Sequence, residues 1–137
     1  MLSANAARAY ADIGLETGVG GASPQRLVVM LYDGAIDAIG DARTHVASGA
    51  HGPRSAAISR AVGIIEQGLR ASLDIAQGGA IARQLDELYD YMTRRLLVAS
   101  LRNDAAALAE VAALLTDLRS AWHAVAAMKP AEARHAA

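Results

Sequence analysis

Apolar residues recur every three to four positions in four segments of the chain, with polar residues between them. This spacing is typical of amphipathic helices, and no segment has the strict alternation expected of a strand. The first predicted helix begins at Pro24, after Ser23, whose hydroxyl suits the N-cap position. The four predicted helices cover about residues 24–48, 53–76, 80–102 and 104–128.

Glycine and proline separate the predicted helices. The stretch Gly49–Pro53 ends the first helix, Gln77–Gly79 ends the second, and Pro130 follows the fourth. These connections are short, so consecutive helices must run antiparallel. The pattern therefore predicts an all-α, up-down-up-down four-helix bundle in a single domain over residues 23–128.

Both ends of the chain are expected to lie outside this bundle. Residues 1–22 form an N-terminal segment with a short helix capped by Ser3 and a flexible joint at Gly18, Gly20 and Gly21. Residues 129–137 form a flexible, alanine-rich tail. The N-terminal segment is expected to dock on the bundle.

Each predicted helix has one apolar stripe that fits burial in a bundle core. In the first two helices the stripes are Leu27, Leu31, Ala35, Ala38, Ala42 and Val46, and Ile58, Val62, Ile65, Leu69 and Leu73. In the last two they are Ile81, Leu85, Leu88, Met92, Leu96 and Ala99, and Leu108, Val111, Leu115, Leu118, Trp122 and Val125.

Further apolar residues fall outside these stripes and predict a groove on the outside of the bundle. They are Val29 and Ile36 on the first helix, Ala57, Ile64, Gly68, Ala71 and Ile75 on the second, and Tyr91, Val98 and Leu101 on the third. So much apolar surface indicates a binding site for a partner helix. The alternative is that these residues widen the core or pack against the N-terminal segment. The two interpretations are compatible if Tyr10, Ile13 and Leu15 form a lid that covers the groove until a partner arrives.

Composition narrows the setting of the protein. The 137 residues carry a net charge of −1, which argues against nucleic acid as a partner. Cysteine is absent, and no apolar stretch approaches the roughly 18 residues of a membrane-spanning helix. The N-terminus lacks the pattern of a signal peptide, so we expect a cytosolic protein without membrane insertion.

Residues for catalysis or metal binding are not arranged in a usable pattern. The four histidines have no i, i+4 pairing, and Glu132 and His135 form a lone Glu-x-x-His motif in the tail. We therefore expect no enzyme, no catalytic residues, no cofactor and no metal. Asp33, Asp37 and Asp41 line one side of the first helix, either as a solvated face or as a charged contact. A bundle metalloprotein and a self-assembling structural bundle remain alternatives, and self-association is left open.

Four sequence blocks identify a family. They are residues 23–35 (SPQRLVVMLYDGA), 61–74 (AVGIIEQGLRASLD), 88–96 (LYDYMTRRL) and 103–104 (ND), preceded by Ala9-Tyr10. In this order and spacing the chain resembles the flagellar secretion chaperones of the FliS family over about residues 9–125.

The resemblance implies a helical bundle in the bacterial cytosol that binds the disordered C-terminal region of flagellin. Such a chaperone prevents premature polymerisation and hands its client to the flagellar type III export apparatus, docking at the export gate. The resemblance also implies that the segment around Tyr10 occupies part of the client site before binding.

Overall fold

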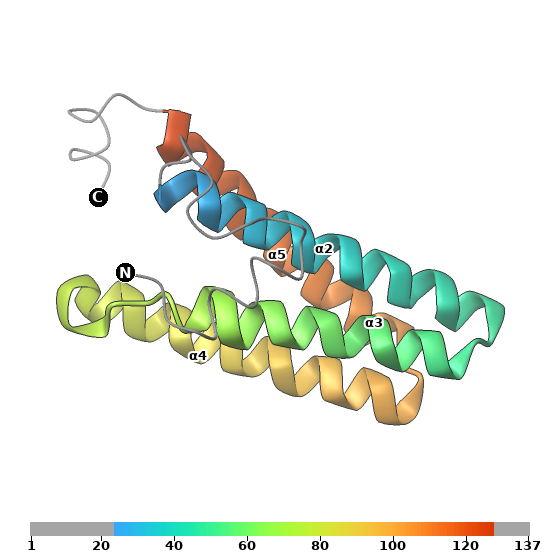
Figure 1. Cartoon of the computed structure of the whole chain (residues 1–137). Helices are drawn as coiled ribbons and strands as arrows, with labels where there is room; N and C mark the ends of the chain where they lie inside the picture. The colour runs from blue at the N-terminus through green and yellow to red at the C-terminus, as the bar shows by residue number, and fades with distance from the viewer. Residues whose placement is uncertain (1–23, 128–137) are drawn as a thin grey trace.

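A computed structural model describes residues 24–127 of the chain, and its elements there are all helical. They are α2 (Pro24–Ser48), α3 (His51–Gly63), the π-helix η1 (Ile64–Arg70), α4 (Ile75–Arg102) and α5 (Ala105–Ala127). η1 continues α3, so the chain forms four antiparallel rods (Figure 1). The predicted all-α four-helix bundle is therefore confirmed.

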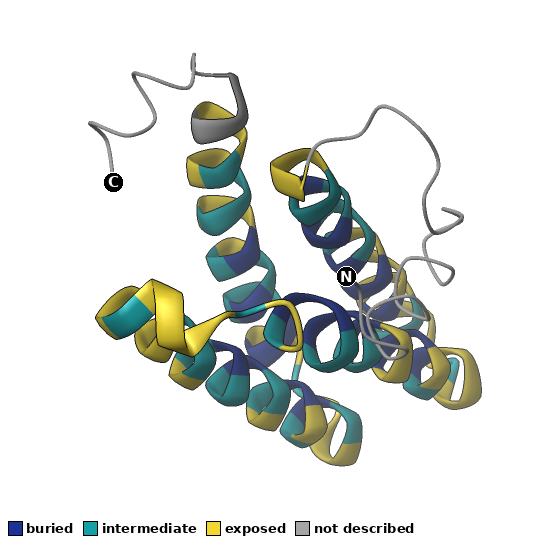
Figure 2. Cartoon of the chain, turned by 60° about the vertical axis from the view of Figure 1, so that its left-hand side comes forward, coloured by how far each residue is buried: buried dark blue, intermediate teal, exposed yellow. Residues whose placement is uncertain are grey.

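The four rods close into a ring. α2 packs against both α3 and α5, while α4 packs against α5, α3 and η1. In Figures 1 and 2 the α2–α5 pair approaches the α3–α4 pair closely at one end and diverges from it at the other. The diverging end holds the start of α2, the end of η1, the start of α4 and the end of α5. The closed end holds the α2–α3 and α4–α5 connections.

Local signals explain the turns at the closed end. Gly49 takes the left-handed conformation (φ 74°), and the following Ala50 N–H donates to the carbonyl of His45. Asn103 ends α4 in the same conformation (φ 55°). The next residue, Asp104, then caps α5 by accepting a hydrogen bond from the Ala107 N–H at 3.1 Å.

The second predicted helix differs from the structure. It was expected to continue to about Ala76, but the regular α-helix ends at Gly63 and the π-helical turn ends at Arg70. Asp74 then caps α4, its carboxylate accepting a hydrogen bond from the Gln77 N–H. Inside α4, Gly79 is non-helical (φ 57°, ψ −131°), so the uninterrupted helix resumes near the predicted start at residue 80.

Most of the predicted core stripes are confirmed. Leu31, Ile58, Met92 and Leu108 belong to one buried cluster, and Figure 2 shows buried positions along the inner faces of the helices. Ile81 is an error of prediction, because its side chain is 64% exposed. The prediction assumed that the bundle is equally tight along its length, whereas Ile81 lies at the diverging end.

Candidate client-binding site

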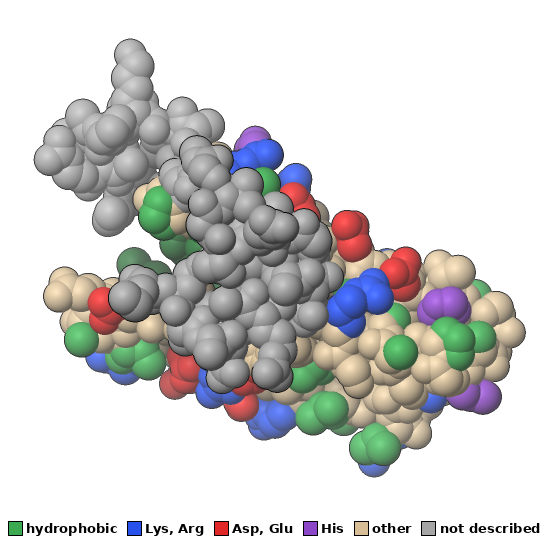
Figure 3. Space-filling model, in the orientation of Figure 1, with side chains coloured by type: hydrophobic (Ala, Val, Ile, Leu, Met, Phe, Trp, Pro, Cys, Tyr) green, Lys and Arg blue, Asp and Glu red, His purple; other side chains and the backbone are tan. Residues whose placement is uncertain are grey.

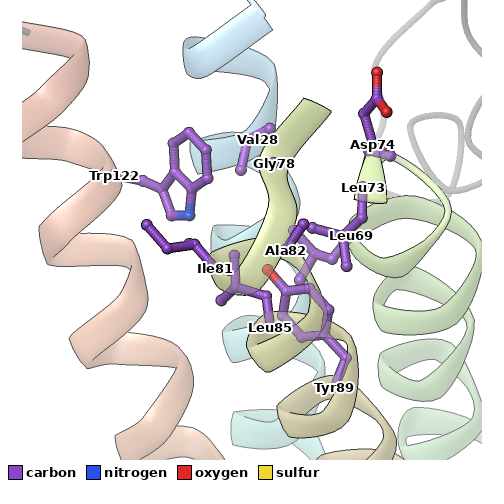
Figure 4. Close-up of a pocket in the computed structure, with 11 residues that line it drawn as sticks. Val28, Leu69, Leu73, Asp74, Gly78, Ile81, Ala82, Leu85, Tyr89 and Trp122 are labelled. Atoms are coloured by element: carbon purple, nitrogen blue, oxygen red, sulfur yellow. The ribbon is translucent and has the colours of Figure 1, made fainter. Parts of the chain in front are cut away.

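An apolar pocket lies at the diverging end of the bundle (Figure 4). Its volume is about 230 Å³. All four rods contribute to its lining, which consists of Val28, Leu69, Ser72, Leu73, Asp74, Gly78, Ile81, Ala82, Leu85, Tyr89 and Trp122. The pocket exists because the core stripes of the four helices separate here before their apolar residues end.

The start of α4 shapes one side of this pocket. A Cβ placed on Gly78 would lie 2.7 Å from the Cβ of Ala82, so only glycine fits here without a shift. The left-handed Gly79 offsets the first turn of α4 from the rest of the helix. Together the two glycines bring the backbone close to the pocket, and Ile81 beside them keeps an exposed apolar side chain.

A buried pair of tyrosine hydroxyls lies at the floor of the pocket, where Tyr89 is part of the lining and Tyr32 lies behind it. Tyr32 of α2 and Tyr89 of α4 are hydrogen-bonded to each other, and their side chains are 0% and 2% exposed. Burial raises the pKa of both hydroxyls above the ordinary value of 10.0. The hydrogen bond between the two hydroxyls opposes the rise of the Tyr32 pKa but does not cancel it. The floor therefore stays neutral at physiological pH.

An ion-pair network stands beside the pocket on η1 and α4. Arg70 Nε donates to Asp86 Oδ1 at 2.7 Å, and Arg70 Nη1 donates to Glu66 at 3.1 Å and to Asp90 at 3.4 Å. The hydrogen bonds that Arg70 donates to Asp86 and Glu66 raise the pKa of its guanidinium. This half-exposed network ties the end of η1 to α4 and holds one wall of the pocket.

The acidic side of α2 is largely an inter-helix contact. Asp33 pairs with Arg119 of α5, and Asp41 pairs with Arg60 of α3 at 2.7 Å. Asp37 lies between them and is exposed. Figure 3 shows acidic and basic side chains intermixed on the face in view. Two of the three aspartates therefore form ion pairs with different neighbouring helices. These pairs explain why like charges share one side of α2.

Four residues of the predicted groove, Val29, Ala57, Ile64 and Gly68, are buried, so their expected accessibility is wrong. Ile64 belongs to the core cluster at 0% exposure, and Gly68 beside it is buried. Ala57, on the same side of the preceding regular helix α3, is buried as well, because α3 and η1 each pack against both α2 and α4 and bury a wider arc than one stripe. Val29 is 1% exposed, although it is not part of the core cluster.

The other predicted groove residues are accessible to different degrees. Leu101 is 86% exposed and Ile75 is 43% exposed, Ala71 is exposed, and Ile36, Tyr91 and Val98 are half-buried. The Tyr91 hydroxyl donates to Glu110 at 2.6 Å, and Arg95 donates to the same carboxylate at 2.7 Å. Ile75 and Leu101 occupy opposite ends of α4, about 40 Å apart along a regular helix. The structure therefore does not unite these residues in one groove.

The apolar pattern placed five of the residues that line the pocket in the core, namely Leu69, Leu73, Ile81, Leu85 and Trp122. Leu69, Leu73, Leu85 and Trp122 all follow the core period, and nothing in a periodic pattern tells where a bundle opens. The adjacent Gly78 and Gly79 are the one local signal, since they permit an irregular start of α4. The predicted lid residues Tyr10, Ile13 and Leu15 lie outside the described residues.

Within residues 24–127, no helix is long and apolar enough to cross a membrane. In the same range, no group of three or more His, Cys, Asp or Glu side chains is arranged to hold a metal ion.

Comparison with known proteins gives the family. The family model described as "Flagellar protein FliS" matches residues 6–129 of this chain. The chain belongs to the FliS family. It is 48% identical over 122 residues to the flagellar secretion chaperone FliS of Salmonella typhimurium and 43% identical over 122 residues to that of Escherichia coli. Each alignment covers 89% of this chain and 90% of the relative. The flagellar secretion chaperone FliSB of Pseudomonas aeruginosa is 36% identical, with 91% and 98% covered. The pocket and its tyrosine floor thus belong to a FliS protein.

Proposed function

We propose that this protein is an export chaperone for flagellin. It binds the disordered C-terminal region of flagellin in the cytosol, prevents premature polymerisation, and hands the subunit to the flagellar type III export apparatus. Membership of the FliS family supports this role, since its relatives carry the name of flagellar secretion chaperones. The role is one of binding and needs no catalytic step.

The observation that carries the proposal is the open apolar pocket at the diverging end of the bundle. Its walls are mainly aliphatic, formed by Val28, Leu73, Ile81 and Leu85 together with the Trp122 indole. An amphipathic helix that folds on binding can place its apolar side chains into such a site. Ordering the client opposes binding by a few kcal/mol, so a deep apolar contact is needed to offset it.

The remaining accessible apolar residues extend the proposed client surface. Ile75 lies on the same end of α4 as the pocket, and Ala71 precedes it in the connection from η1. Leu101, Tyr91, Val98 and Ile36 are proposed as further contacts for a client that wraps around the bundle. The segment with Tyr10, Ile13 and Leu15 is proposed as a lid, and the loaded chaperone is proposed to dock at the export gate.

Calorimetry of the full chain against a flagellin C-terminal fragment tests the proposal. We expect binding at micromolar concentrations or tighter. Ile81→Asp should weaken it at least tenfold while helicity is retained, because Ile81 is exposed and lines the pocket. Gln84→Asp, at an exposed α4 position outside the pocket, is the matched control and should bind normally. Absence of micromolar binding by the unaltered protein would reject the proposed function. Equal loss in both variants would instead place the client elsewhere.

A further inference from the structure

One hydrogen-bond donor at the floor of the pocket is left without a partner. Tyr32 and Tyr89 each have one O–H donor and one oxygen that can accept. A single hydrogen bond joins the two hydroxyls. Only one of the two O–H groups can donate in this bond, so the other is left without a partner within the pair.

The direction of this hydrogen bond identifies the free donor. If Tyr32 donates to Tyr89, the remaining O–H belongs to Tyr89, which lines the pocket. If Tyr89 donates to Tyr32, the remaining O–H belongs to Tyr32, which is 0% exposed and does not line it. The first arrangement is favoured, because an unmet donor in the interior is destabilising.

The surroundings of the Tyr89 hydroxyl define what it can bind. Figure 4 shows the hydroxyl beside Ile81 and Ala82, with Trp122 facing it across the pocket. A group that reaches it must pass aliphatic walls, so the body of this group must be apolar. A carboxylate would be desolvated there and would pass Asp74 on the pocket lining. An ammonium group carries only donors, so it cannot accept a hydrogen bond from the Tyr89 hydroxyl.

We propose that the pocket binds an uncharged group with an apolar body and an oxygen acceptor at its tip, which accepts a hydrogen bond from Tyr89. A side-chain amide or hydroxyl of a bound client helix has this chemistry. The inference that a client supplies this group rests on the proposed function, whereas the inference that the pocket binds such a group does not. Tyr89 is then a specificity residue that selects this acceptor among apolar side chains.

Two probes of nearly equal shape test the site in the full chain. Cyclohexanone carries an oxygen acceptor, whereas methylenecyclohexane replaces that oxygen with a carbon. The protein has a single tryptophan, so its indole N–H gives one signal in a ¹H–¹⁵N spectrum, and Trp122 lines the pocket. Titration of this signal with each probe gives two dissociation constants.

Tyr89→Phe should weaken cyclohexanone binding by about three- to tenfold, the range of one hydrogen bond, and leave methylenecyclohexane binding unchanged. Tyr32→Phe removes a hydroxyl outside the pocket and should keep the preference for the ketone. Tyr91→Phe, whose hydroxyl contacts Glu110, is the control for loss of a tyrosine hydroxyl on α4. Equal affinities of the unaltered protein for the two probes, or no binding of either, would overturn the proposed site.

A competition experiment then tests whether the client supplies the group that occupies the pocket. A bound flagellin C-terminal fragment should displace cyclohexanone from the pocket. If the fragment binds and the ketone stays, the client source is wrong while the site stands. If the fragment fails to bind at all, the proposed function fails and the probe titrations still decide the site.

Discussion

Arg54 near the start of α3 and Asn103 at the end of α4 are joined by a hydrogen bond of 2.6 Å, although 49 residues separate them. The same guanidinium donates to the carbonyl of Ser100 at 3.0 Å and contacts Nδ1 of His51 at 2.7 Å. The Arg54 side chain is almost buried, at 8% exposure. These hydrogen bonds hold α3 and α4 together at the closed end of the bundle. The helix pairs diverge at the opposite end.

Removal of this contact should destabilise the protein. Arg54→Ala leaves the carbonyl of Ser100 without its donor, and we expect a loss of about 2–3 kcal/mol in the free energy of unfolding. Arg60→Ala, which breaks the exposed pair with Asp41, should change it by less than about 1 kcal/mol. Urea unfolding followed by circular dichroism measures both values. Equal effects would mean that the buried arginine contributes no more than a surface pair.

A charge at Ile64 should have a different effect from a charge at Leu101. Ile64 is 0% exposed, so Ile64→Asp buries a carboxylate and should lower the free energy of unfolding by about 4 kcal/mol or more. Leu101→Asp, at 86% exposure, should change it by no more than about 0.5 kcal/mol. Thermal unfolding of the two variants provides the comparison. A folded and stable Ile64→Asp protein would indicate that Ile64 lies on the outer surface, as the sequence pattern predicted.

The glycine within α4 should resist substitution. Gly79 has φ 57° and ψ −131°, a region that side chains disfavour, so Gly79→Ala should destabilise by about 1–3 kcal/mol. Gly40 lies in the exposed middle of α2, where an added Cβ meets nothing within 4 Å. Gly40→Ala should therefore stabilise by about 0.5–1 kcal/mol, the helix preference of alanine over glycine. Shifts of the same sign in both variants would contradict the irregular start of α4.

Alkaline pH should unfold the protein cooperatively. The pKa values of Tyr32, Tyr89 and Tyr91 are raised above 10.0, the first two by burial and the third by its hydrogen bond to Glu110. Above pH 10 the unfolded chain releases protons that the folded chain keeps, so this contribution to stability is complete below pH 10 and declines above it.

Tyrosinate absorbance and circular dichroism, recorded over the same pH range, test this expectation. Most of the absorbance should appear together with the loss of helicity. Tyr91→Phe serves as a control, since it removes one shifted group and leaves the buried pair in place. Titration of every tyrosine near pH 10 with helicity intact would contradict the raised pKa values.

Deletion of residues 1–15 should strengthen client binding if the proposed lid exists. A lid that is closed for nine tenths of the time weakens the apparent affinity about tenfold. The truncated protein should therefore bind a flagellin C-terminal fragment up to about tenfold more tightly, or associate with it faster. Stopped-flow fluorescence of Trp122 measures the association rate. Unchanged affinity and rate would leave the N-terminal segment without a regulatory role.

The helices and most of the core follow from the sequence because their causes are local. Pro24, Gly49 and Asn103 mark helix ends through conformations that depend on a few neighbouring residues. Leu31, Met92 and Leu108 lie on a regular 3.6-residue period, which is enough to predict their burial. The four sequence blocks were equally readable, and the family they indicate is confirmed.

The positions of Ile64, Val29 and Ile81 were decided only by the tertiary structure. Ile64 is buried because α3 and η1 pack against both α2 and α4, and Ile81 is exposed because the helix pairs diverge. Val29 is buried outside the core cluster. The same divergence makes a pocket from residues whose pattern is that of a core. Periodicity reports which side of a helix is apolar, but the distance between helices depends on contacts far apart in the chain, such as Tyr32 with Tyr89 and Arg54 with Asn103.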